Sequence, residues 1–84
     1  MKIEKADLRN ERTVYDYAEA RALIERNARQ AIATAREARS LAAGLRSTIE
    51  DRFATALAMQ EGPDRARVLD ALGSECRRAM AHVN

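Results

Sequence analysis

Residues that end helices are nearly absent from this chain, whose 84 residues include one proline and three glycines. Alanine, arginine, glutamate and leucine, all strong helix formers, dominate the remaining positions. The proline directly follows a glycine, at Gly62-Pro63, so the two strongest breaking signals fall at one place. The sequence therefore predicts an all-α fold with one helical domain, residues 13–84, preceded by a lead segment, residues 1–12.

The Gly62-Pro63 pair predicts a tight turn between two helices. Glycine suits the left-handed residue after a helix end, and proline suits the first turn of a helix, where its missing N–H is no loss. We expect the last helix to run from about Pro63 to Ala81, antiparallel to the helix before it. A helix-turn-helix motif is the alternative, because Ala58, Gly62 and Val68 match its spacing. Proline stands where that motif usually packs an aliphatic side chain, which favours the plain hairpin turn.

A heptad-like apolar spacing in the first part of the domain predicts one long helix that starts at Val14. Gly44 interrupts this segment, and residues 47–50 (Ser-Thr-Ile-Glu) have the form of a capping box, so a second helix starting at Thr48 is the alternative. The spacing stays in phase on both sides of Gly44, which favours a continuous or kinked helix. The positions of this seam are Val14, Tyr17, Ile24, Ala28, Ala31, Ala35, Ala38, Ala42, Leu45 and Ile49, with Arg21 at a further one.

Alanine occupies five successive positions of the seam. They are Ala28, Ala31, Ala35, Ala38 and Ala42. Small side chains let a second helix approach closely, near the short end of the ~8 to 10 Å range of helix separations. The chain has 18 alanines against 20 larger apolar residues, so its core buries little area for a domain of this size. We therefore expect a helical-bundle homo-oligomer in which the alanine seam is the contact between helices.

Arginines beside the seam predict a surface for a charged partner. Guanidinium groups bind carboxylates and phosphates through two parallel hydrogen bonds, so this ridge suits an acidic protein surface, a nucleotide phosphate or a nucleic-acid backbone. The alternative is that the arginines pair with acids of a partner helix and so set the register of an oligomer. Tyr15 is a candidate stacking residue near them, with capping of the core as its alternative. The candidate partner-binding or phosphate-binding residues are Arg21, Arg29, Arg36, Arg39, Arg46 and Tyr15.

Signatures of catalysis, metal binding or a cofactor are lacking. The single cysteine, Cys76, falls on the inward stripe of the last helix, where a thiol packs as a small apolar group. His82 is six positions further on, and no carboxylate completes a nucleophile arrangement. The sequence has no apolar run of about 18 residues and a charged amino terminus, so we expect a cytoplasmic protein that does not enter membranes.

The charge of the chain is mildly basic, with a net charge of +2 and a pI of about 9.1. A strongly basic balance is more typical of nucleic-acid binders. In size, helicity and its single tight turn, the chain resembles plasmid-encoded and phage-encoded helical hairpin proteins that dimerise or form rings, some of which bind RNA or sequester nucleotides. The resemblance implies an oligomer and assigns no site residue.

We therefore expect a small non-enzymatic helical oligomer that acts by protein–protein recognition. Its role would be that of an adaptor, an inhibitor or a small regulatory protein of bacterial or phage type, with a protein as its partner. Binding of nucleic acid or of phosphate-bearing nucleotides through the arginine ridge is the alternative function.

Overall fold

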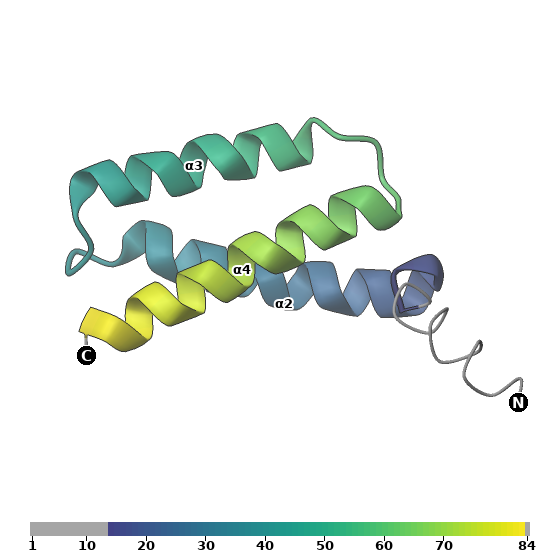
Figure 1. Cartoon of the computed structure of the whole chain (residues 1–84), viewed down its shortest axis with the longest axis horizontal. Coiled ribbons are helices and arrows are strands. Elements are labelled where there is room, and N and C mark those ends of the chain that lie inside the picture. The colour runs from purple at the N-terminus through teal and green to yellow at the C-terminus, as the bar shows by residue number, and fades with distance from the viewer. Residues whose placement is uncertain (1–13, 84) are drawn as a thin grey trace, which may run out of the picture.

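The computed structural model describes residues 14–83, which form a bundle of three helices (Figure 1). Helix α2 spans Ala18–Glu37, α3 spans Ala43–Leu57 and α4 spans Pro63–Val83. α3 runs opposite to both α2 and α4, so α2 and α4 run in the same direction (Figure 1). The described residues contain no strand, and the predicted all-α class is confirmed.

The prediction of one long helix through Gly44 is wrong. α2 ends at Glu37, the chain turns over residues 38–42, and α3 starts at Ala43. The alternative of two separate helices is confirmed, but its predicted start at the capping box is wrong, because Thr48 lies inside α3. The physical reason for the turn is tertiary packing: Leu41 is only 4% exposed, and the reversal brings Ile49 of α3 into the core that α2 and α4 share.

The start of the first helix also differs from the prediction. Residues 14–16 are helical, but Tyr17 has extended backbone angles (φ −88°, ψ 126°) and interrupts the helix before α2 starts at Ala18. The lead segment, residues 1–12, and Thr13 lie outside the described residues.

The start of α4 at Pro63 is confirmed, and Asp64 places an acid in its first turn. The predicted left-handed glycine at position 62 is wrong, because no described residue has a positive φ. Five residues, 58–62, connect α3 to α4, and Ala58 keeps right-handed angles (φ −77°, ψ −12°). This connection needs no left-handed residue. The carbonyl of Gly62 accepts the first hydrogen bond of α4 from the Ala66 N–H (3.1 Å).

The core lies along the contact between α2 and α4, and α3 closes it from one side. The largest fully buried side chains are Ile32, Leu69, Leu72 and Cys76. Burial of each large aliphatic side chain contributes about 1.5–3 kcal/mol. Most of the apolar stabilisation therefore comes from α2 and α4.

Two small residues set the separation of α2 and α4. A Cβ built on Gly73 would lie 2.9 Å from the Cα of Ala28 and 3.0 Å from its Cβ. The glycine thus brings the two backbones together near the middle of both helices. No described helix is both long and apolar enough to span a membrane.

Candidate functional site

An open groove runs between α2 and α4. Its volume is about 710 Å³, within the range of about 300–1,000 Å³ typical of ligand sites. Apolar side chains and uncharged polar side chains share the lining, with one acid and one base on α4. The lining residues are Ile24, Asn27, Gln30, Ala31 and Thr34 from α2, and Asp70, Arg77, Met80 and Ala81 from α4.

Tyr15 lies next to one end of the groove. Its hydroxyl donates a hydrogen bond to the Oδ2 atom of Asp70 (2.9 Å), and the Arg67 guanidinium stands over its ring at 5.1 Å from the centroid. The hydrogen bond to Asp70 and partial burial raise the pKa of Tyr15 above its ordinary value. Arg21 donates to the backbone carbonyls of Tyr15 (2.9 Å) and Asp16 (3.0 Å) and so holds this turn against α2. Tyr15 thus lies beside Arg21 and Arg67 with its hydroxyl engaged by Asp70, and its role as a stacking residue stays a prediction.

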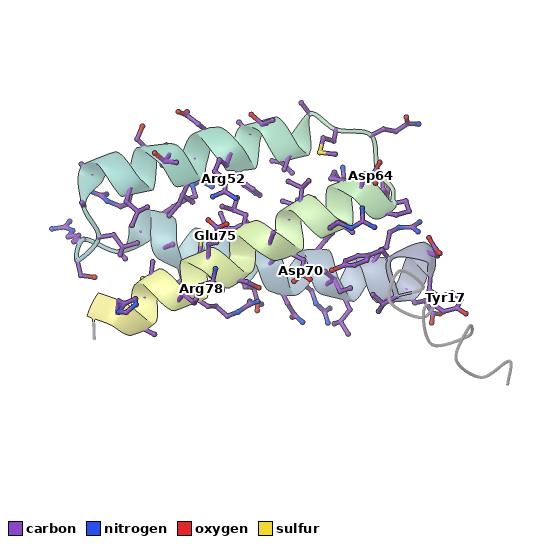
Figure 2. All side chains as sticks on the ribbon, in the orientation of Figure 1. Tyr17, Arg52, Asp64, Asp70, Glu75 and Arg78 are labelled. Atoms are coloured by element: carbon purple, nitrogen blue, oxygen red, sulfur yellow. The ribbon has the colours of Figure 1, made fainter. Side chains whose placement is uncertain are left out.

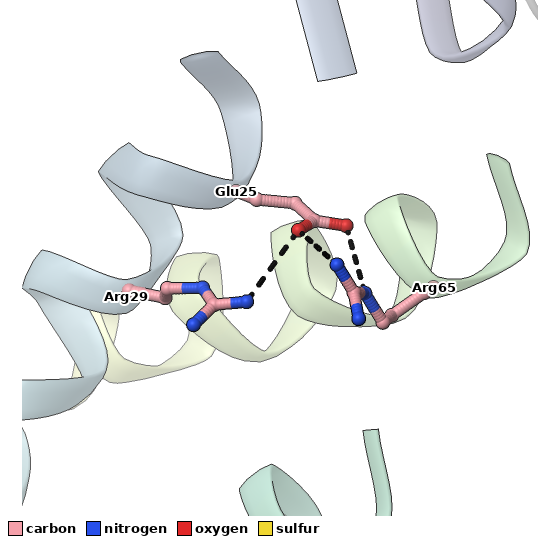
Figure 3. A network of polar contacts seen from close by, with 3 residues as sticks. All are labelled: Glu25, Arg29 and Arg65. Atoms are coloured by element: carbon pink, nitrogen blue, oxygen red, sulfur yellow. Dashed lines mark hydrogen bonds and ion pairs between the residues drawn. The ribbon is translucent and has the colours of Figure 1, made fainter. Parts of the chain in front are cut away.

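An ion cluster around an almost buried carboxylate ties α2 to α4 (Figure 3). Glu25 is 8% exposed and accepts two hydrogen bonds from Arg65, from Nε to Oε2 (3.2 Å) and from Nη2 to Oε1 (3.0 Å). Arg29 lies 3.6 Å from the same Oε1 atom. A fork geometry of this kind compensates a carboxylate that burial would otherwise destabilise. The cluster fixes the pairing of α2 and α4.

The arginines of the predicted ridge, together with Arg21 of the seam, do not all lie on one helix. Arg29 contacts Glu25, and Arg36 pairs with Glu50 of α3 (3.7 Å) and stands over the Phe53 ring (5.6 Å). Arg36 therefore pairs with an acid of another helix in the same chain, whereas the acid that Arg29 contacts belongs to its own helix. Pairing with acids of a partner chain stays a prediction.

The remaining arginines of the ridge lie at three separate places. Arg21 binds backbone carbonyls before α2, and Arg46 lies on α3 and donates from Nε to the Leu41 carbonyl (3.3 Å). Arg39 is exposed in the turn at residues 38–42. The heptad frame that aligned the ridge assumes a continuous helix. Arg29 and Arg36 stay together on α2 with Arg21, and the turn separates Arg39 and Arg46 from them.

The alanine seam is divided between the core and the surface. Ala28 and Ala35 are fully buried, Ala31 and Ala38 pack at the edge of the core, and Ala42 is exposed. The close packing that the seam predicts takes place within one chain, where Ala28 meets Gly73 of α4. Oligomerisation through these alanines stays a prediction. The sequence signal that could have located this crossing is Gly73 itself, a glycine in a helix interior.

Three titratable residues of α3 and α4, Cys76, Arg52 and Glu75, are held in the contact between the helices. Cys76 is 1% exposed, and burial raises the pKa of its thiol, which disfavours the reactive thiolate. Arg52 of α3 and Glu75 of α4 face each other (Figure 2) and make two hydrogen bonds, which lower the pKa of the Glu75 carboxyl. Among the described residues, no group of three or more His, Cys, Asp or Glu side chains could hold a metal ion.

No protein-family model matches the chain, and comparisons with curated proteins and with solved structures give no significant match. The interpretation of the groove therefore depends on its own residues and geometry.

Proposed function

We propose that this protein is a non-enzymatic recognition module and that the groove between α2 and α4 binds an amphipathic helix of a partner protein. The observation that carries the proposal is the composition of the groove. Apolar atoms of Ile24, Ala31 and Met80 lie among amide and hydroxyl groups, with one acid and one base on α4. Such a mixture suits a partner helix with an apolar stripe and polar flanks.

The dimensions of the groove fit a helical ligand. Its lining runs from Ile24 to Thr34 on α2 and from Asp70 to Ala81 on α4. At about 1.5 Å per residue, these segments are roughly 15 Å long, which matches about three turns of a bound helix. A basic residue of the partner would pair with Asp70 and an acidic one with Arg77, so the two charges would set the direction of binding.

The alternative function, binding of phosphates or nucleic acid through the predicted ridge, draws less support. Arg29 and Arg36 already pair with acids, and Arg21 and Arg46 donate to backbone carbonyls. A phosphate would have to compete with these partners. If the chain binds phosphates, the logarithm of its affinity should fall linearly with the logarithm of the salt concentration. The slope should be about −0.9 per phosphate contact on duplex DNA.

The test compares two matched threonines. Thr34 lines the groove and Thr48 lies on α3; both are exposed, and both donate a hydroxyl hydrogen bond to the carbonyl four residues earlier (3.0 Å and 3.1 Å). Proteins retained from an extract of the native host are identified by mass spectrometry, and helical segments of each are synthesised. We expect one such peptide to bind the wild-type chain in calorimetry, with affinity for Thr34→Arg lower by about tenfold or more, the loss of about 1.4 kcal/mol of binding free energy.

Thr48→Arg is the matched control and should keep the wild-type affinity, because it adds the same charge and volume away from the groove. Equal affinity of the peptide for both variants would place the binding surface elsewhere. A chain that binds duplex DNA with a steep salt dependence and retains no protein would favour the phosphate alternative.

A further inference from the structure

The turn between α2 and α3 is built from residues that favour helix. Residues 38–42, Ala-Arg-Ser-Leu-Ala, include no glycine or proline, and none has a positive φ. Ala42, the residue before α3, makes no side-chain capping hydrogen bond. The connection between α3 and α4 differs, because Pro63 at the start of α4 prevents a helix from continuing through it. Only the first of the two connections could become helical.

The apolar spacing also continues across this turn. Ala35, Ala38, Ala42, Leu45 and Ile49 follow one another at alternating intervals of three and four residues. In a continuous helix they would form a single stripe. In the bent chain this stripe is interrupted, and Leu45 is left 42% exposed. Local sequence and tertiary packing thus favour different conformations of the same five residues.

We propose that two copies of this chain exchange their α3–α4 hairpins, with residues 38–42 straightened so that α2 and α3 form one helix. Each bundle of the dimer then consists of α2 from one copy and α3–α4 from the other. Exchange of identical elements is a low-cost route to a dimer, because it reuses the contacts of the monomer. The inference is independent of which partner the groove binds.

The contacts that would hold the exchanged dimer are those already present between α2 and the α3–α4 hairpin. The approach of Ala28 to Gly73 and the bonds between Glu25 and Arg65 would both form between copies. The two hydrogen bonds from Arg52 to Glu75 would stay within one copy, since both residues belong to the hairpin. This division makes the exchange testable with charge variants.

The experiment uses Glu25→Arg and Arg65→Glu in two separate chains. Each variant alone brings like charges together at this contact, whether the contact is within or between copies. In an exchanged dimer of the two variants, one bundle brings together the two substituted side chains, which have opposite charges, and the other keeps the native Glu25 with the native Arg65. Both bundles are then complementary, whereas in monomers mixing changes nothing.

We expect the two variants, refolded together from denaturant at equal concentrations, to sediment with the mass of two chains. The melting temperature of the mixture should exceed that of either variant by at least about 4 °C. The double variant in one chain is the control and should melt near the wild type in either arrangement. A mixture that melts as the sum of its two components overturns the proposal.

A proline pair provides a second test that does not depend on charge reversal. Ala43 is the exposed first residue of α3, and Ala42 before it has φ −60° and ψ 145°, the extended geometry that precedes proline. Ala43→Pro therefore fits the bent chain and blocks a helix through residues 38–42. Ala18→Pro, at the first position of α2 after the extended Tyr17, is the matched control.

We expect the wild type and Ala18→Pro to dimerise after refolding at high concentration, and Ala43→Pro to stay monomeric. Equal dimerisation of the two proline variants, or a wild type that stays monomeric, overturns the exchange. Loss of groove binding in the Thr34→Arg variant is a separate result, since that substitution leaves the turn unchanged.

Discussion

At the scale of single residues, the contact between α2 and α4 depends on the absence of one side chain. A Cβ on Gly73 would meet the Cα of Ala28 at 2.9 Å, and the main chain of α2 cannot move aside as a flexible side chain would. Gly44 has open space around it, with no atom within 4 Å of the position that a methyl group would take. Replacement by alanine should therefore have opposite effects on stability at these two helical glycines.

Gly73→Ala should destabilise the protein by about 1–3 kcal/mol, because the added methyl forces α2 and α4 apart. Gly44→Ala should stabilise it by about 0.4–1 kcal/mol, because the unfolded chain loses freedom and no atom is displaced. Urea unfolding followed by circular dichroism measures both. A stabilising Gly73→Ala would mean that the helices do not approach as closely as the structure has them.

Tyr15 gives the chain a pH dependence on the alkaline side. The hydrogen bond to Asp70 raises its folded-state pKa above the ordinary 10.0. A group whose pKa is raised in the folded state adds to the free energy of unfolding. This contribution is complete below the pKa of the unfolded state and is lost as the pH rises through the pKa of the folded state. We therefore expect Tyr15→Phe to lower the melting temperature at neutral pH and to flatten its decline above about pH 10.

Tyr17→Phe is the control for this experiment, because Tyr17 is 62% exposed. It should follow the wild-type melting profile at each pH. If Tyr15→Phe also runs parallel to the wild type above about pH 10, ionisation of Tyr15 is not linked to folding.

At the scale of the helices, α3 is the least firmly attached of the three. It supplies two buried residues, Ile49 and Ala56, with Phe53 packed at the edge of the core. Its ion pairs to α2 and α4 are exposed, and exposed pairs contribute only about 0–1 kcal/mol each. Local opening is expected first in the element with the fewest buried apolar contacts.

Amide hydrogen exchange should therefore be faster in α3 than in the centre of α4. Ile49→Ala should raise exchange mainly in α3, whereas Leu72→Ala should cost about 2–5 kcal/mol and raise exchange in all three helices. Mass spectrometry of peptic fragments resolves the helices. Equal protection of α3 and α4 in the wild type would show that the bundle opens only as a whole.

At the scale of the whole molecule, the sequence predicts the helices better than it predicts how they are arranged. The start of α4 follows from Pro63, whose ring both fits a first helical turn and excludes an earlier helix. The end of α2 does not follow from local sequence, because residues 38–42 favour helix and yet form a turn that places Leu41 in the core. Local propensity is a weak guide where tertiary packing opposes it.

The candidate site was harder to predict than the core for the same reason. Ala28 and Ala35 are buried within one chain, in line with the close packing that small residues at seam spacing indicate. Their predicted contact between chains stays a prediction. The predicted arginine ridge depends on a continuous helix, and the turn separates Arg39 and Arg46 from Arg29 and Arg36. The groove requires α2 and α4 to lie side by side in parallel, which no local pattern in either helix indicates.

The contact between Ala28 and Gly73 is a point about which α2 and α4 could rotate relative to each other. Because the contact lies near the middle of both α2 and α4, the two helices extend about equally far on either side of a common pivot. A ligand that moved α2 and α4 apart at the end that carries Met80 would rotate the two helices about this contact. The rotation would strain the hydrogen bonds between Glu25 and Arg65 on the other side of the contact. Binding at one end of the bundle would then change the contacts at the other end, while each helix kept its own conformation.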